Sequence, residues 1–430
     1  MSRKRARRLI ALAVLLILLT SSLFWVSRPS RVATLLLDSV GASLGLEISA
    51  SGAAEYRLRG TPMLLLRGVV AREPGAATPL LRADRIYLSL PWSTLRARGD
   101  DLTVQRIELD RPRLDLPALQ RWLAKRPPSE KRFPTLTEGL RITDGSIANG
   151  DDSNGSWHIV GIHAVIPSLY PDRPMQARVR GRYLAPPLAI AVDLVVALSR
   201  PEALIQAKTT GIATNGRIAI ESGDWRIPGT VALSGPLRVG DDDLRVTPAR
   251  LGVAAAYASA ETRVPFALGL HGPLRFDEAT WTLAPAGVAV RRRDARADDP
   301  VPTLDARGAL AFGHRMTLQL NGVIAHWPEA WPALPPPIGQ SRSPLPFALS
   351  YDGNTDFTDS TALQLRRDAT RFAGRFGLQD VLAWSRTVAT DSPLPPITGT
   401  LTTPQLIISG AELEGVEIEF EDDETAASLP

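Results

Sequence analysis

Large hydrophobic residues alternate with small or polar ones along most of this chain, and a period of two predicts β-strands. In the segment 86–90, Ile86, Leu88 and Leu90 would share one face of a strand. The longest alternation covers Leu188–Leu198 and predicts a strand of eleven residues. Its large apolar face needs a cover, which can be another layer of the protein or a bound ligand. The candidates for this contact are Leu188, Ile190, Val192, Leu194, Val196 and Leu198.

Turn sequences separate the alternating segments and predict hairpins of an antiparallel meander. Frequent glycine and proline, 33 and 36 residues, agree with many short strands. Proline-rich stretches at 127–134, 332–346 and 393–396 are expected to be loops or joints. Before the second stretch, Trp327 and Trp331 are expected to pack onto the sheet, with a binding site as the alternative. The turn sequences are Asp144-Gly145, Asn149-Gly150, Asn154-Gly155, Asn215-Gly216, Ser222-Gly223 and Asp352-Gly353.

A short motif occurs twice. The segment 235–238, Gly-Pro-Leu-Arg, recurs at 272–275, and Pro248-Ala249 recurs at the same offset as Pro285-Ala286. Two copies fit successive hairpins that extend one sheet. Chance similarity in a chain rich in glycine, proline and leucine is the alternative.

Two segments depart from the period of two. Residues 31–46 place apolar side chains at steps of three and four, which predicts an amphipathic helix packed on the first strands. A second, short helix is predicted over Leu116–Lys125, opened by Pro117. The apolar residues of the first helix are Val32, Leu35, Leu36, Val40 and Leu44.

Residues 9–26 carry no charge and follow a basic cluster, a pattern typical of a transmembrane helix. A helix of this length spans about 27 Å, close to the thickness of a bilayer core. The positive-inside rule places the N-terminus in the cytoplasm and the remaining chain across the membrane. A cleaved signal peptide is the alternative, with small residues at Thr20 and Ser22, but the apolar run continues to Val26. The anchor residues are Leu9, Leu16, Leu19 and Trp25, and the topology determinants are Arg3, Lys4, Arg5, Arg7 and Arg8.

The charge distribution argues against nucleic acid as a partner. Residues 1–8 carry +5 and the whole chain carries +4, so the remainder sums to −1. A nucleic-acid-binding domain would keep its basic excess on the folded part.

Residue types that carry chemistry are sparse. The chain has no cysteine, which excludes thiol catalysis and thiolate metal sites. The run Asp241–Asp243 lacks the spacing of a calcium loop, and no nucleotide-binding or hydrolase motif is present. We therefore expect no catalytic residue, no metal, no cofactor and no enzyme activity. The five histidines, none at metal-binding spacing, are His158, His163, His271, His314 and His326.

Several segments resemble the AsmA-like family, which includes TamB and YhdP. They are Leu80–Pro91 (LLRADRIYLSLP), Leu102–Leu116 (LTVQRIELDRPRLDL), the hairpin-like Leu140–Tyr170 and the C-terminal Pro395–Glu419. The AsmA-like family is similar to the bridge-like lipid-transfer proteins. The resemblance therefore implies a long curved β-sheet with an apolar concave face. It also implies phospholipid movement toward the outer membrane, and the face of Leu188–Leu198 would then contact lipid.

The resulting prediction is a mainly β protein, with one N-terminal transmembrane helix, a long curved antiparallel β-groove and one or two short helices near its start. The expected location is the bacterial inner membrane, with most of the chain in the periplasm. Expected partners are phospholipid and the inner membrane, with outer-membrane or periplasmic envelope proteins as further candidates. A non-enzymatic assembly factor for outer-membrane proteins or a secretion system is the alternative function. The predicted domains are 1–8 (cytoplasmic), 9–26 (anchor), 27–127 (AsmA-like), 128–420 (β-groove) and 421–430 (acidic tail).

Overall fold

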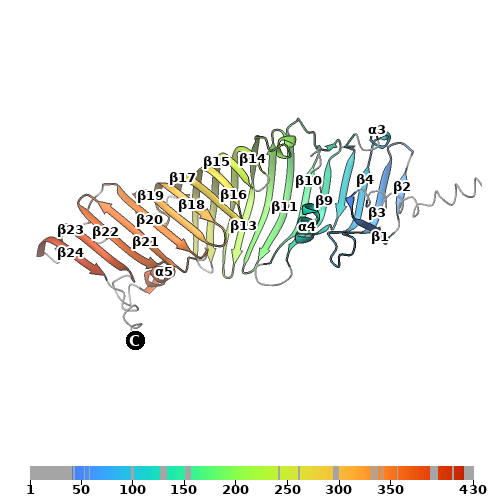
Figure 1. Cartoon of the computed structure of the whole chain (residues 1–430). Coiled ribbons are helices and arrows are strands. Elements are labelled where there is room, and N and C mark those ends of the chain that lie inside the picture. Colours follow the sequence, from blue (N-terminus) through green and yellow to red (C-terminus); the bar gives the residue numbers. More distant parts are fainter. Residues whose placement is uncertain are drawn as a thin grey trace, which may run out of the picture. The chain divides into compact units, whose positions relative to one another are not determined.

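The computed structural model is mainly β, as predicted, with mixed strand pairing and few helices (Figure 1). The chain forms two compact units, Met1–Val195 and Val196–Pro430. The domain boundaries predicted from the sequence stay predictions. The residues that the structure describes are 41, 44–52, 54–57, 59–97, 101–125, 133–150, 156–240, 243–259, 262–293, 300–329, 331, 334, 338–339, 341, 343–355, 357–387, 396–408 and 411–420.

The predicted transmembrane segment 9–26 lies outside the described residues. Among the helices that are described, none has the length and apolar character needed to cross a bilayer. The predicted amphipathic helix over 31–46 is described at few positions, of which Gly41 and Leu44 are helical.

The first unit begins with antiparallel strands that are built around β3 and β4. Strands β1 and β2 both pair with β3, β3 pairs with β4, and β4 pairs with β6 and β7. Later strands β9, β10 and β11 also pair antiparallel in chain order. The bounds are β1 (Glu47–Ala50), β2 (Glu55–Arg57), β3 (Met63–Arg72), β4 (Leu81–Ser89), β6 (Arg106–Asp110), β7 (Arg113–Asp115), β9 (Leu140–Asn149), β10 (Trp157–Ile166) and β11 (Met175–Ala185).

The prediction of an entirely antiparallel sheet is wrong in this unit. Strands β6 and β7 pair with β9 in parallel, and β5 (Thr103–Val104) pairs in parallel with β8 (Thr135–Leu136). The reason is a helical crossover, because a parallel partner can be reached only when the chain returns to the starting end of the strand. Helix α4 (Leu116–Ala124) lies in that crossover.

Helix α4 confirms the short helix predicted over Leu116–Lys125. Asp115 caps it, since a side-chain oxygen of Asp115 accepts a hydrogen bond from the Ala118 amide at 2.7 Å, and Pro117 occupies the first turn. Ala118 is buried in a cluster with Leu46, Ala71 and Leu80. The short helix α3 (Trp92–Arg96) was not predicted.

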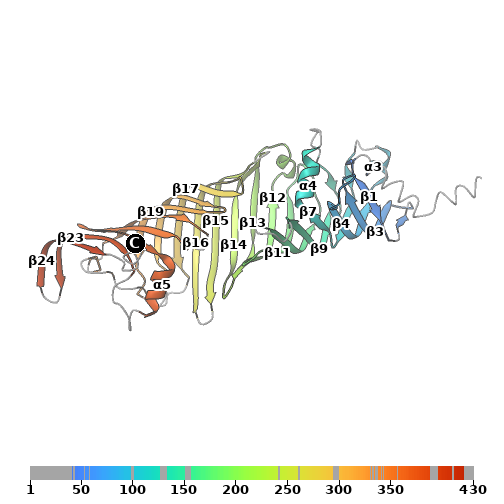
Figure 2. The same cartoon turned by 60° about the horizontal axis from the view of Figure 1, so that its bottom comes forward.

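The second unit is an antiparallel meander in which each strand from β13 to β24 pairs with the next along the chain. Figure 2 shows that its strands turn progressively, so this sheet is twisted and curved. Helix η1 (Pro201–Leu204) precedes the meander, and α5 (Leu378–Thr387), which was not predicted, follows β22. The strands are β13 (Thr210–Ser222), β14 (Trp225–Val239), β15 (Leu244–Ser259), β16 (Thr262–Asp277), β17 (Thr280–Arg292), β18 (Thr303–Phe312), β19 (Met316–His326), β20 (Leu345–Gly353), β21 (Ser360–Arg367), β22 (Thr370–Gly377), β23 (Thr398–Ile408) and β24 (Ala411–Phe420).

The predicted turns were partly wrong. Ser222-Gly223 ends β13, and Asp352-Gly353 ends β20, as expected. Asn215-Gly216 instead lies inside β13, where Gly216 pairs with Val231. The strand continues through this dipeptide and turns only after Ser222, because its pairing with β14 extends that far. Asp144-Gly145 lies inside β9 at an irregularity of the register, where Asp144 has a φ of 54°. Aspartate tolerates this left-handed conformation in a bulge as well as in a turn.

Strand β12 occupies Leu188–Leu198, the bounds that the alternation predicted. The division between the two units falls inside it, between Val195 and Val196.

Candidate functional site

One face of the second unit's sheet is lined by a row of residues that crosses every strand from β13 to β24. Each member is the direct cross-strand partner of the next, and nearly all are apolar. We call it the central row. Its members are Thr214, Leu233, Leu251, Leu270, Val288, Ala306, Gly322, Phe347, Leu365, Phe372, Leu401 and Ile418.

Two further rows flank the central row on the same face, so the apolar surface is several residues wide. The first flanking row is Gly216, Val231, Val253, Leu268, Val290, Leu304, Ile324 and Leu345. The second flanking row is Thr210, Leu237, Val246, Leu274, Leu283, Leu310, Leu318, Tyr351, Thr361 and Phe376.

The length of the central row suits an acyl chain. With about 4.8 Å between neighbouring strands, the twelve strands give a row of roughly 50 Å. One leaflet of a bilayer core is about 15 Å thick, so an extended acyl chain would cross about three strand spacings. A hydrocarbon chain laid along the row would meet apolar side chains at most positions, Thr214 and Gly322 being the exceptions.

Burial divides this face into an open and a covered part. On β13–β16 the central-row residues Leu233, Leu251 and Leu270 are half-buried, so part of their apolar surface faces solvent. Beyond β16 most of the row is buried, with Val288 8% and Leu401 1% exposed, while Gly322, Phe372 and Ile418 are half-buried. The open part is therefore the section where a ligand can reach the row.

The cover over the closed part comes from the connection between β19 and β20. Ile338, which is 1% exposed, belongs to the same apolar cluster as Leu345, Phe347 and Leu365, and Trp327 and Leu334 pack against that cluster. We call the described residues of the range 327–343 the covering segment. The Trp327 and Trp331 rings contact each other edge-on at 4.9 Å between centroids. The expectation that this tryptophan region packs onto the sheet is confirmed for Trp327.

Arg367 fastens the covering segment to β21. Its Nη1 donates to the carbonyl oxygens of Ile338 and Ser341 at 2.7 and 2.9 Å. Next to it, the Ser343 hydroxyl donates to Asp368 at 3.1 Å. Hydrogen bonds from Ser341 and Ser343, together with the Arg367 charge, lower the pKa of Asp368.

The six residues predicted to contact a ligand lie on β12. Leu188, Ile190, Val192 and Leu194 are half-buried in the first unit. In the second unit, Val196 is half-buried and Leu198 is buried. Asp193, on the opposite face of β12, forms ion pairs with Arg178 and Arg180 at 3.2 Å each.

Sequence reasoning missed the central row, although its signal was present. The segments 225–239, 244–259 and 262–276 alternate in the same way as Leu188–Leu198. The alternation gives the apolar face of each strand, but only the register shows that these faces meet in continuous rows.

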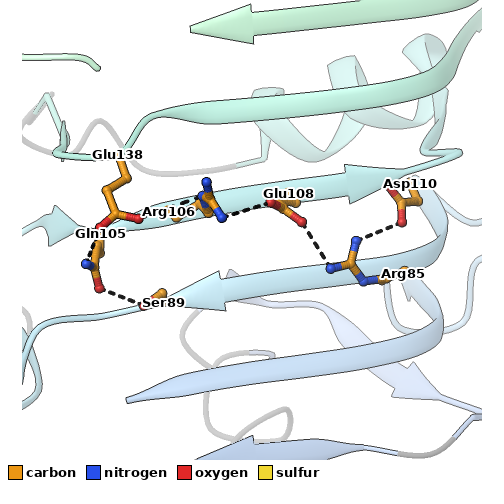
Figure 3. A network of polar contacts seen from close by, with 7 residues as sticks. All are labelled: Arg85, Ser89, Gln105, Arg106, Glu108, Asp110 and Glu138. Atoms are coloured by element: carbon orange, nitrogen blue, oxygen red, sulfur yellow. Dashed lines mark hydrogen bonds and ion pairs between the residues drawn. The ribbon is translucent and has the colours of Figure 1, made fainter. Parts of the chain in front are cut away.

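The first unit contains a polar network on β4 and β6 (Figure 3). Arg85 bridges Glu108 and Asp110 at 3.0 and 2.9 Å, and Arg106 contacts Glu108 at 3.4 Å. The hydrogen bond to Asp110, opposed by burial, is the main reason that the pKa of Arg85 is raised. The network continues through Glu138 and Gln105 to the Ser89 hydroxyl.

This network has the chemistry of a structural ion-pair cluster. Ser89 donates to the Gln105 amide oxygen, and an amide cannot take up a proton as a general base would. In the described part of the chain, this network included, no group of three or more histidine, aspartate or glutamate residues could hold a metal ion.

No protein-family model, curated protein or solved structure matches this chain. Its function is therefore inferred from the residues and their arrangement.

Proposed function

We propose that this chain binds phospholipids through their acyl chains and handles or conducts them toward the outer membrane. The observation that carries the proposal is the central row, which is continuous over twelve strands and half-exposed on β13–β16. The open part of the row on β13–β16 is costly in water unless an apolar ligand or partner covers it.

The physical chemistry of the row suits a carrier. Burying one methylene group contributes about 0.8 kcal/mol, so a chain lying over three strands gains several kcal/mol along the row. Neighbouring positions offer similar side chains, so a lipid can shift from one to the next without losing all its contacts. This task needs no covalent chemistry.

The proposed location rests on two features of the sequence. The uncharged segment 9–26 and the basic cluster before it support an inner-membrane anchor with the sheet on the periplasmic side. The resemblance to the AsmA-like family supports the same location and the direction toward the outer membrane.

Strand β12 is proposed to contribute to the same task. Five of its six candidates keep exposed apolar surface, and Asp193 on the other face forms ion pairs with Arg178 and Arg180. We expect Leu194→Asp to leave the protein folded and to remove bound lipid. Unchanged lipid content in this variant would exclude β12 from the lipid path.

Site-specific photo-crosslinking in living cells tests the open row directly. A photoreactive phenylalanine derivative replaces Leu251 in the full-length chain, and the cells are grown with radioactive phosphate before irradiation. The matched control carries the derivative at Glu417, which is exposed on β24 on the face opposite the central row and lies outside β14–β18. We expect an adduct that carries phosphorus label at position 251 and none at position 417.

The same experiment distinguishes the alternative. If position 251 crosslinks to a protein and acquires no phosphorus label, the apolar face is a docking surface and an assembly factor is the better interpretation. If neither position crosslinks, lipid conduction along the row is wrong.

A further inference from the structure

The polar face of β14–β18, opposite the apolar rows, is strongly basic. It carries eight exposed arginines, against two aspartates within the strands, Asp277 and Asp305. Three further acids, Asp224, Asp243 and Glu278, lie in the turns that adjoin these strands. The arginines are Arg226, Arg238, Arg245, Arg250, Arg263, Arg275, Arg291 and Arg307.

The repeated Gly-Pro-Leu-Arg motif creates the densest part of this face. Arg245 is the direct cross-strand partner of both Arg238 and Arg275, which end the two copies of the motif. Like charges placed directly opposite each other on neighbouring strands destabilise a sheet. The stability of the fold therefore does not explain why Arg238, Arg245 and Arg275 lie side by side, and a binding role can explain it.

Carboxylates neutralise this row only in part. Asp243 contacts both Arg245 and Arg275, and Asp277 contacts Arg275 at 2.6 Å. Arg291 pairs with Asp305. The structure gives no ion pair to a described residue for the other five arginines, which are Arg226, Arg238, Arg250, Arg263 and Arg307.

The arrangement of the charges indicates the kind of partner. The arginines extend over five strands, about 19 Å, and Arg226 and Arg238 stand about 40 Å apart along β14. A single phosphate group or one extended polyanion would meet only a few of them. A two-dimensional array of anionic headgroups would meet many at once, and each basic residue near such a surface adds to the attraction.

We propose that the arginine face of β14–β18 binds the surface of an anionic bilayer. This contact uses the face opposite the central row, so it does not depend on the proposed function. It would hold the second unit against a membrane by electrostatic attraction that weakens as the ionic strength rises.

Vesicle flotation tests the proposal with the full-length protein held in phosphatidylcholine nanodiscs. The nanodiscs are mixed at low salt with vesicles of phosphatidylcholine alone or with one third phosphatidylglycerol. We expect binding only to the anionic vesicles and its loss at high salt. Replacing Arg238, Arg245 and Arg275 with glutamine should weaken binding about a hundredfold, from roughly fivefold per charge.

Three variants control for charge, folding and position. The same three residues changed to lysine should keep binding, because the attraction follows charge. A second glutamine triple at Arg226, Arg250 and Arg263 tests the surface independently if the first fails to fold. Glutamine at the exposed Arg82, Arg113 and Arg141 removes three charges from the first unit and should leave binding unchanged.

Three results with vesicles would overturn the proposal. The first is equal binding to neutral and anionic vesicles. The second is unchanged binding by both glutamine triples of the arginine face, and the third is a loss of binding in the first-unit triple as large as in those two. Retention of a soluble acidic polypeptide without vesicle binding would also overturn it and would indicate a protein partner.

Discussion

Gly235 in β14 lies so close to Pro248 in β15 that a Cβ atom at residue 235 would be 2.4 Å from the proline carbonyl oxygen. Gly272 has the same relationship with Pro285, at 2.2 Å. The paired Gly-Pro-Leu-Arg and Pro-Ala motifs are therefore two copies of one close backbone approach between neighbouring strands. This geometry favours successive strands of one sheet over chance as the origin of the repeat.

Gly235→Ala and Gly272→Ala should each lower the free energy of unfolding by about 1–3 kcal/mol, the usual range for overpacking. The atom that a new methyl group would meet belongs to the backbone and cannot rotate away. Gly252→Ala is the matched control, since no atom lies within 4 Å of its Cβ position. Urea unfolding of the three variants measures the effect, and equal midpoints would contradict this account of the repeat.

Arg367→Ala should loosen the covering segment. The substitution removes the donor to the carbonyl groups of Ile338 and Ser341, and hydrogen bonds from charged groups contribute about 2 kcal/mol. We expect faster trypsin cleavage between residues 327 and 343, where Arg342 offers a site.

Arg366→Ala is the control for this substitution. Arg366 is the neighbouring exposed residue, and it pairs across strands with Arg371 on the other face. If both variants are cleaved at the same rate as the unchanged protein, Arg367 does not fasten the segment.

Asp368 should make the attachment of the covering segment sensitive to acid. Its pKa is lowered in the folded protein, so its contribution is present above the unfolded value of about 3.8 and is lost as the pH falls through the lower folded value. Asp368→Asn should therefore make trypsin cleave the chain after Arg342 faster at pH 7. Hydrogen exchange of residues 338–343, which works at low pH, should show no difference below the folded pKa. A difference that is independent of pH would assign the effect to packing.

Arg85→Ala should destabilise the first unit by about 1–3 kcal/mol, because it leaves the half-buried Glu108 and Asp110 without their shared partner. Arg106 still contacts Glu108, so the loss should be smaller in Arg85→Ala than in the double variant with Arg106→Ala. Arg82→Ala, at an exposed position of β4, should change the urea midpoint little. Additive effects of Arg85 and Arg106 would mean that the two do not share Glu108.

The sequence by itself determined the class of fold and several elements. The alternation in Leu188–Leu198 predicted β12 with its bounds, and the segment opened by Pro117 predicted α4. These features depend on residues close in the chain, because side-chain period and helix caps are local properties.

The tertiary structure decided how those strands combine. The parallel pairing of β9 and the position of Asn215-Gly216 inside a strand depend on partners distant in sequence. The same holds for the central row, because shifting one strand by a single residue would turn its leucines to the other face. Register therefore placed Leu233, Leu251 and Leu270 in one row and Arg238, Arg245 and Arg275 in another on the opposite face.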